Sequence, residues 1–205
     1  MDPRIADNYA HRHLSHIYPV FPGAEISAQS QPELFEAFRR AVDLRELGAQ
    51  SGWSFAHMAC IRARMGEAER AAECLDGAAK SVIMDSLFTT HNDWRNMGIT
   101  VQWDGESFVQ LDAVFGQVNA VQEMLFRAGR DELHLLPARP ARLSSGSVRG
   151  IRFPGGTADF EWADGGVAAT VFAERDVDTA LLAAGRELGT LRLSAGEIKT
   201  VRFSV

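Results

Sequence analysis

Apolar residues recur at three- and four-residue intervals between residues 30 and 80, a pattern typical of amphipathic helices. The first predicted helix starts at a Ser-Gln-Pro-Glu segment (30–33), which has capping-box spacing with proline in the first turn, and it ends before Gly48. The next two helices meet at Gly66, so we expect them to pack antiparallel. The three apolar stripes are Leu34, Phe35, Phe38, Ala41 and Val42; Phe55, Met58, Ala59, Ile61 and Met65; and Ala68, Ala71, Ala72, Leu75 and Ala79.

The helical pattern is interrupted between Ser86 and Leu111 by a polar and aromatic connection. Connections of this length inside a compact domain are usually functional or mobile. Helical spacing returns over residues 115–128, and Gly129 stands where a helix of this kind ends. The first 140 residues are therefore predicted to be helical around one long irregular segment.

After Pro140 the pattern changes to short alternating segments separated by glycine-rich turns. Helices followed by strands predict an α+β chain in two parts, a helical domain over 1–140 and a small antiparallel β domain over 141–205. The predicted strands span 148–153, 158–162, 167–172, 188–193 and 198–205.

Composition narrows the functional classes. The 205 residues are 46% hydrophobic and 23% charged, with a net charge of -6 and no cluster of basic residues, so nucleic acid is not an expected partner. No apolar run is long enough to span a bilayer, and the N-terminus lacks the pattern of a signal peptide; the compartment stays open if the chain is a fragment. Cys60 and Cys74 lie in predicted helices and are expected to be reduced and buried.

The segment 11–16 reads His-Arg-His-Leu-Ser-His, and prolines at 19 and 22 exclude a regular helix after it. An ordered loop with this density of donors suits a ligand rich in hydroxyl groups or oxyanions. We expect Arg12 and His13 to contact such a ligand, and His11 and His16 to satisfy backbone carbonyls. A zinc site completed by His91 or Asp112 is an alternative, but the histidine spacing does not favour it, so neither a metal nor a cofactor is predicted.

Several segments, in order, resemble glycoside hydrolase family 95. They are residues 11–23, Ser-Gly-Trp-Ser at 51–54, Gln-Leu-Asp-Ala-Val-Phe-Gly at 110–116 with Gln-Glu-Met-Leu at 122–125, Glu-Leu-His-Leu-Leu-Pro-Ala at 132–138, and Gly-Ser-Val-Arg-Gly at 146–150. The resemblance spans roughly residues 8 to 165. It implies the last helices of an (α/α)6 barrel followed by a β domain, and an inverting exo-α-L-fucosidase acting on terminal α1,2-linked fucose. α-L-Galactosidases are relatives.

The resemblance also implies roles for four residues. Arg12 and His13 would bind the hydroxyl groups of the sugar, and His91 would line the same pocket. Asp112 would help asparagine side chains to activate the attacking water, although Ala113 and Val114 replace the usual Gly and Asn of the motif. Capping of the following helix is an alternative role for Asp112 that is compatible with catalysis.

Two tryptophans are candidates for stacking on a pyranose ring, because an aromatic ring can cover the apolar C–H face of a sugar. Trp53 lies at a predicted helix start, where packing in the core is the alternative. Trp103 lies in the irregular connection. Trp94 and Trp162 are assigned to packing.

In the family, the general-acid glutamate and the asparagine pair lie upstream of the histidine-rich segment. We therefore expect this chain alone to have little or no glycosidase activity, and its expected partner is a fucosylated oligosaccharide. A non-catalytic carbohydrate-binding or structural remnant is the main alternative. Part of a helical barrel also exposes apolar faces, which predicts self-association through the open edge of the barrel.

Overall fold

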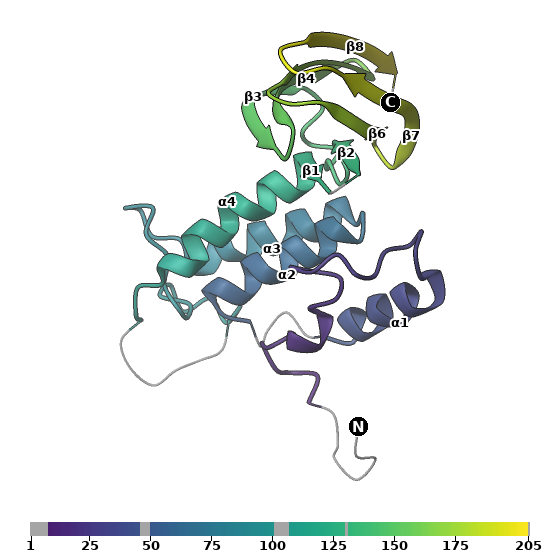
Figure 1. The fold of residues 1–205 in the computed structure, drawn as a ribbon. Coiled ribbons are helices and arrows are strands. Elements are labelled where there is room, and N and C mark those ends of the chain that lie inside the picture. Colours follow the sequence, from purple (N-terminus) through teal and green to yellow (C-terminus); the bar gives the residue numbers. More distant parts are fainter. Residues whose placement is uncertain (1–7, 46–49, 101–106, 130, 205) are drawn as a thin grey trace. The chain divides into compact units, whose positions relative to one another are not determined.

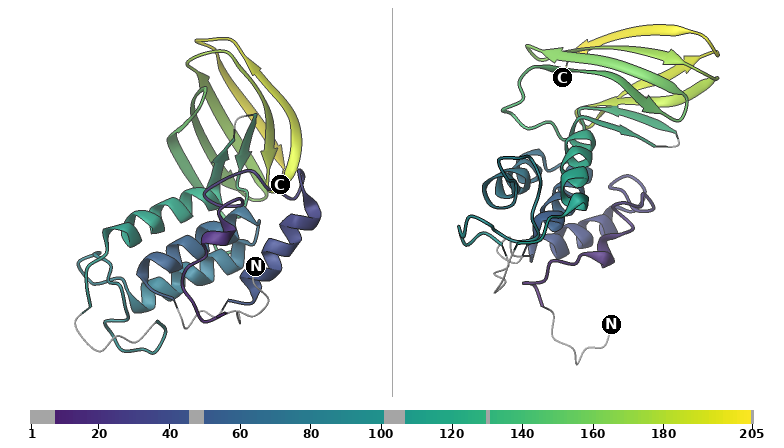
Figure 2. Two further views of the ribbon diagram at one scale, coloured as in Figure 1. Left: turned by 60° about the horizontal axis from the view of Figure 1, so that its bottom comes forward. Right: turned by 90° about the vertical axis from the view of Figure 1, so that its left-hand side faces the viewer.

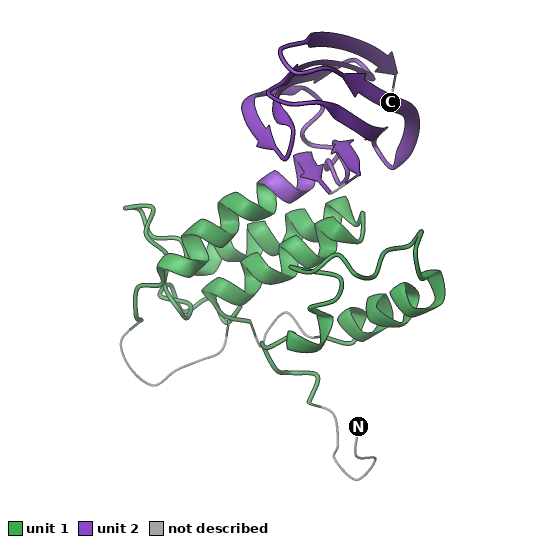
Figure 3. Ribbon diagram, in the orientation of Figure 1, with its two compact units in different colours: residues 1–121 green, residues 122–205 purple. Residues whose placement is uncertain are grey.

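The computed structural model describes residues 8–45, 50–100, 107–129 and 131–204. The chain forms two compact units, residues 1–121 and 122–205 (Figure 3). This division differs from the boundary predicted between residues 140 and 141, because two short strands before residue 141 join the β unit. The limits 1–140 and 141–205 stay a prediction.

Helices make up most of the described part of the first unit (Figure 1). The helices are α1 (Pro32–Asp43), α2 (Gly52–Arg64), α3 (Ala68–Ser81) and α4 (Leu111–Leu125), and a short 3-10 helix, η1 (Ser15–Ile17), precedes them. The predicted helical hairpin is present, and its turn uses Gly66 at a φ of 75°. The predicted capping box at 30–33 is absent, because Gln31 is the N-cap and the hydroxyl of Ser30 pairs with Ser27. A capping box is present instead at Ser51 and Ser54 of α2.

Helix α4 spans Leu111–Leu125, whereas the helical spacing predicted a helix over 115–128, and residues 126–128 form β1 instead. Its apolar side chains Phe115, Val118 and Val121 are 69%, 67% and 42% exposed, whereas Ala113 and Ala120 are fully buried. The small residues face the neighbouring helix because only they permit close approach of the two backbones. The described part of the first unit therefore leaves the larger apolar face of α4 uncovered.

The second unit contains two four-stranded sheets (Figures 1 and 2). One has the order β1-β2-β6-β7 and the other the order β3-β4-β5-β8. All pairings between strands within residues 141–205 are antiparallel, whereas β2, which precedes this range, pairs with β6 in parallel. The long stretch of chain between β2 and β6 permits this parallel pairing. The strands are β1 (Phe126–Ala128), β2 (Glu132–Leu135), β3 (Gly146–Phe153), β4 (Gly156–Ala163), β5 (Gly166–Ala173), β6 (Val177–Ala183), β7 (Arg186–Leu193) and β8 (Ile198–Ser204).

Each unit has its own apolar core. Cys60 and Cys74 are buried in the first core and form no disulfide, as predicted, and burial raises the pKa of the Cys74 thiol to about 12. Trp162 lies in the second core, where its Nε1 donates to the carbonyl oxygen of Leu143 over 2.8 Å. Among the described residues, no helix is long and apolar enough to cross a membrane.

Candidate functional site

Backbone hydrogen bonds join the start of α2 to the irregular connection that precedes α4. The amide of Gly52 donates to the carbonyl oxygen of His91 over 2.8 Å. The amide of His91 in turn donates to the carbonyl oxygen of Phe108 over 2.7 Å. The amide of Trp53 donates to Oε1 of Gln110 over 3.1 Å. The connection that the sequence marks as irregular is therefore tied to the N-terminal turns of both α2 and α4.

Two glycines bring α2 and α4 close together. A Cβ atom on Gly52 would lie 2.2 Å from the carbonyl oxygen of Thr90 and 3.3 Å from the Cβ of Ala113. A Cβ atom on Gly116 would lie 2.7 Å from that of Ala56. Because real Cβ atoms do not approach so closely, larger residues at these positions would push the two helices apart.

A small cavity of about 270 Å³ opens where these helices meet. Trp53 comes from the first turn of α2, and Asp112 comes from the first turn of α4. Asp112 accepts a hydrogen bond from the amide of Ala113 over 3.0 Å, and a helix N-terminus favours a negative charge at this position. The cavity is lined by Phe21, Trp53, Ala56, His57, Cys60, Asp112, Gly116 and Asn119.

The histidine-rich segment is held by its apolar residues. Leu14 and Ile17 are 1% and 0% exposed, which fixes the polar residues between and before them in place. The ring of His13 lies 5.1 Å from that of Trp53, centroid to centroid. His11 is exposed, and its Nδ1 accepts a hydrogen bond from the amide of His13 over 3.2 Å. From the sequence, His11 is expected to donate to a backbone carbonyl, and here it pairs with a backbone amide instead.

Arg12 supplies the positive charge of this region. Its Nε is buried and has no hydrogen-bond partner within the described part of the chain. A buried N–H group without a partner costs free energy, and a bound ligand could supply the missing acceptor. The guanidinium acts electrostatically on both His13 and His91, so all three side chains share one neighbourhood.

The imidazoles of this neighbourhood favour the neutral form. Burial, followed by the charge of Arg12, lowers the pKa of both His13 and His91, whereas Asp112 opposes the change at His91. Burial, followed by the charge of His13, lowers the pKa of His57. A neutral imidazole donates from one nitrogen and accepts at the other, which suits sugar hydroxyl groups.

The structure thus brings together five of the six predicted site residues, namely Arg12, His13, Trp53, His91 and Asp112. The sixth, Trp103, lies outside the described residues. In the described ranges, no group of three histidine, cysteine, aspartate or glutamate side chains could hold a metal ion.

Sequence reasoning missed His57, Gln110 and Asn119. His57 follows Trp53 by four residues on α2, so it lies on the same helix face, and this spacing is the signal that could have identified it. The only signal in the sequence for Gln110 is its place in the motif that contains Asp112. Asn119 follows Asp112 by seven residues, which is two helical turns along the same face of α4, and its Nδ2 donates to Sγ of Cys60 over 3.4 Å.

Residues 2–125 match the model of the glycosyl hydrolase family 95 catalytic domain. The chain is 30% identical over 190 residues to alpha-L-fucosidase 2 of Arabidopsis thaliana, covering 85% of this chain and 20% of the relative. It is 29% identical over 184 residues to a "Probable alpha-fucosidase A" of Aspergillus niger, covering 82% of this chain and 22% of the relative. The chain therefore spans about a fifth of the length of these relatives.

A solved structure shares the fold. The "Putative kojibiose phosphorylase from human microbiome" matches 95% of this chain and 25% of its own, with a TM-score of 0.51 and 10% sequence identity. At this identity the likeness concerns the fold alone. The match covers both the helical and the β part of the chain.

Proposed function

The chain belongs to glycoside hydrolase family 95, and from this premise we propose that it forms one side of the active site of an inverting exo-α-L-fucosidase. The proposed substrate is a glycan that carries terminal α1,2-linked L-fucose. In this proposal Arg12, His13 and His91 bind the sugar, and Asp112 polarises the attacking water. The names of the curated relatives support a glycosidase that acts on fucose.

The proposal rests above all on the convergence of Arg12, His13 and Asp112 from segments a hundred residues apart in the sequence. The buried Nε of Arg12 offers a donor to a sugar oxygen. Neutral imidazoles at His13 and His91 can donate to one hydroxyl group and accept from another. Trp53, next to His13, can cover the apolar face of the ring.

Asp112 is suited to the water-activating role. Inversion requires a base-assisted water on the face of the sugar opposite the leaving group. The N-terminus of α4 favours a negative charge at this position, which suits a carboxylate that accepts hydrogen bonds. Its hydrogen bond with the amide of Ala113 fixes one oxygen and leaves the other for a ligand or for side chains that hold the water.

Asp112 is the one carboxylate among the described residues that line this cavity. Inversion uses two carboxyl groups, about 6.5–9.5 Å apart. We infer that the general acid comes from further helices of an (α/α)6 barrel, of which α1 to α4 are the last members. The uncovered apolar face of α4 is where such helices would pack. By itself, the chain then binds the sugar through one side of the active site, which we call the half-site, and does not turn it over.

Proton NMR of the 205-residue chain mixed with fucosyl-α1,2-galactose tests both parts of the proposal. Saturation of protein methyl groups should transfer to the fucose protons, because the half-site binds the sugar. No free fucose should accumulate. Release of fucose would overturn the inferred inactivity, and a lack of saturation transfer would overturn the sugar-binding role.

One observation favours a second function. A cavity with a single carboxylate and several neutral donors also suits a non-catalytic carbohydrate-binding protein. An activity assay distinguishes the two functions if it is made on a longer polypeptide that contains this chain and the remaining barrel helices. Turnover there supports the enzyme, and binding without turnover supports the binding protein.

A further inference from the structure

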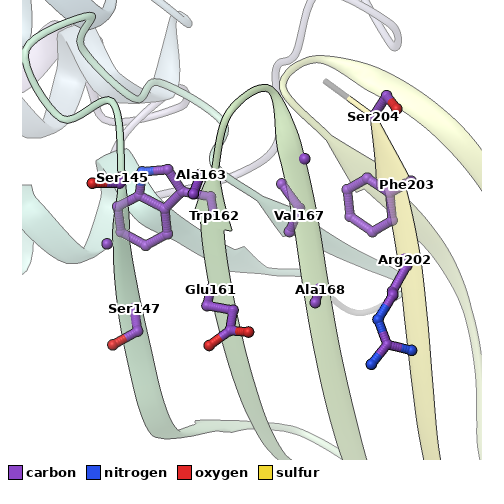
Figure 4. Close-up of a pocket in the computed structure, with 12 residues that line it drawn as sticks. Ser145, Ser147, Glu161, Trp162, Ala163, Val167, Ala168, Arg202, Phe203 and Ser204 are labelled. Carbon is purple, nitrogen blue, oxygen red and sulfur yellow. The ribbon is translucent and has the colours of Figure 1, made fainter.

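The sheet β3-β4-β5-β8 has an open hollow of about 770 Å³ at one end (Figure 4). The residues that line it all lie in the second unit, and none of them lines the cavity around Asp112. The hollow follows the row of cross-strand neighbours Ser147, Glu161, Ala168 and Arg202.

The hollow exists because the central residue of this row is small. Ala168 stands on β5 between Glu161 on β4 and Arg202 on β8, and Figure 4 shows these two longer side chains on either side of it. Adjacent strands lie about 4.8 Å apart, so the backbones of β4 and β8 are separated by about 10 Å. Towards the β4–β5 turn, the paired Ala163 and Gly166 extend the same low surface.

The neighbouring positions of the same face of β5 are filled. Thr170 is hydrogen bonded through its hydroxyl to Thr200 over 2.9 Å. Phe172 covers the next position and is 39% exposed. The hollow is thus a local feature of the Ala168 row and not a general property of this sheet.

The two flanking side chains offer complementary polar groups. Glu161 accepts from Arg149 at Oε2 over 3.2 Å, and among the described residues no donor contacts its Oε1. The arginines of β3 are paired, Arg149 with Glu161 and Arg152 with Glu174, whereas Arg202 has no partner in the part of the chain that the structure describes. Arg202 therefore presents a planar fork of N–H donors across from a carboxylate acceptor.

The local charges select a neutral ligand. Around the hollow, Arg149 and Arg202 balance Glu161 and Asp159, which lies in the next row of the same face. A sugar can donate hydroxyl protons to Glu161 and present vicinal oxygens to Arg202, while its C–H face lies on Ala168 and Gly166. Ser145, Ser147 and Ser204 add hydroxyl groups at the rim.

We propose that this hollow is a second carbohydrate-binding site, which holds a neutral oligosaccharide between Glu161 and Arg202. The choice of ligand rests on the proposed function, because a chain that handles fucosylated glycans meets neutral sugars. No catalytic role is assigned to the site. It would add a second point of attachment to a glycan and so raise avidity.

The test is a titration of the isotope-labelled 205-residue chain with fucosyl-α1,2-galactose, followed through amide chemical shifts. Amides of Gly166, Ala168 and Arg202 should shift with a millimolar dissociation constant. Ala168→Leu should abolish these shifts, because leucine fills the floor of the hollow while suiting a half-buried strand position. Arg202→Ala should weaken binding about tenfold, the effect of one lost charged hydrogen bond.

Matched controls are Thr157→Leu, on the same face of β4 outside the hollow, and Arg192→Ala on β7, which pairs with Asp178. Neither should change the titration. Unchanged shifts in Ala168→Leu, an absence of shifts in wild type, or stronger binding of galacturonate than of galactose would overturn the proposal.

The same spectra separate this inference from the proposed function. Shifts around Arg12 report the half-site, and shifts around Ala168 report the hollow. The variant Arg12→Ala should lose the first set and keep the second. If only the second set appears in wild type, the proposed function fails while the inference about the hollow holds.

Discussion

Asp112 has two roles, because its carboxylate accepts a hydrogen bond from the amide of Ala113 in the first turn of α4 and also lines the candidate cavity. In a longer polypeptide that contains this chain and releases fucose, Asp112→Asn keeps the shape and removes the charge. We expect kcat to fall about 100-fold or more with a small change in substrate binding, since the charge acts mainly in the transition state. Steady-state kinetics of the two proteins measure this, and an unchanged kcat would remove Asp112 from the catalytic role.

We expect His134 to make the stability of the second unit depend on pH. Burial, followed by the charge of Arg127, lowers its pKa from 6.5 to about 4, against the opposing effect of Glu132. Its Nε2 accepts a hydrogen bond from the amide of Gly185 over 3.0 Å, which requires the unprotonated form. Between pH 6.5 and 4 the unfolded chain binds a proton that the folded chain does not, so stability present above pH 6.5 is lost as the pH falls.

The loss attributable to His134 is about 3 kcal/mol across this window. Urea unfolding at several pH values should therefore show a flatter profile for His134→Gln than for wild type, because glutamine accepts the same hydrogen bond without titrating. His16→Gln, at an exposed position, should keep the wild-type profile. Equal slopes for wild type and His134→Gln would show that His134 does not control the pH dependence.

The contact between α2 and α4 is the element on which the candidate site depends. Gly116→Ala places a Cβ atom against that of Ala56 and should lower the free energy of unfolding by about 1–3 kcal/mol through overpacking. Ala56→Gly removes the opposing methyl group, so the double variant should lose less than the sum of the two single variants. Chemical denaturation of all four proteins gives the coupling energy, and strict additivity would argue against a close contact here.

Elements with strong local signals could be predicted from the sequence. The hairpin of α2 and α3 has two apolar stripes and a glycine at the turn, and the hairpins after Pro154 and Asp164 have explicit turn residues. β1 continues the helical spacing of α4 without a break, and β6 is rich in alanine and leucine, so neither has a strand pattern. The parallel pairing of β2 with β6 joins distant segments, which no local pattern encodes.

The candidate site was predictable where a motif marks it. Arg12, His13 and Asp112 stand in motifs, whereas His57 and Asn119 occupy ordinary helix positions. Their place at the cavity follows from the close approach of α2 and α4 at Gly116, a property of packing in three dimensions. The exposed stripe of α4 has the same origin, since helical periodicity identifies an apolar face without identifying what covers it.

At the scale of the whole molecule, the uncovered apolar face of α4 predicts association. Phe115 and Val118, with Leu111 at 55% exposed, form a continuous apolar surface on one side of the helix. We expect the isolated chain to self-associate through it. Phe115→Lys with Val118→Lys should yield a monomer of unchanged fold, because both side chains are mostly exposed.

Analytical ultracentrifugation measures this association. Leu34→Lys, at another exposed apolar position on α1, serves as the control and should associate as wild type does. A wild-type chain that stays monomeric at high concentration would contradict the prediction. Association that survives the double lysine variant would place the contact elsewhere.

In the proposed function, the first unit holds the sugar-binding side of a fucosidase site, and Arg12 is its main donor. Calorimetric titration of L-fucose into the 205-residue chain at pH 7 measures this role of Arg12. Arg12→Ala is compared with wild type, and Arg40→Ala, which changes an exposed arginine on α1, is the control. We expect wild type and Arg40→Ala to bind equally, and Arg12→Ala to bind at least about tenfold more weakly. Equal affinity of Arg12→Ala and wild type, or no binding of L-fucose by wild type, would contradict the claim.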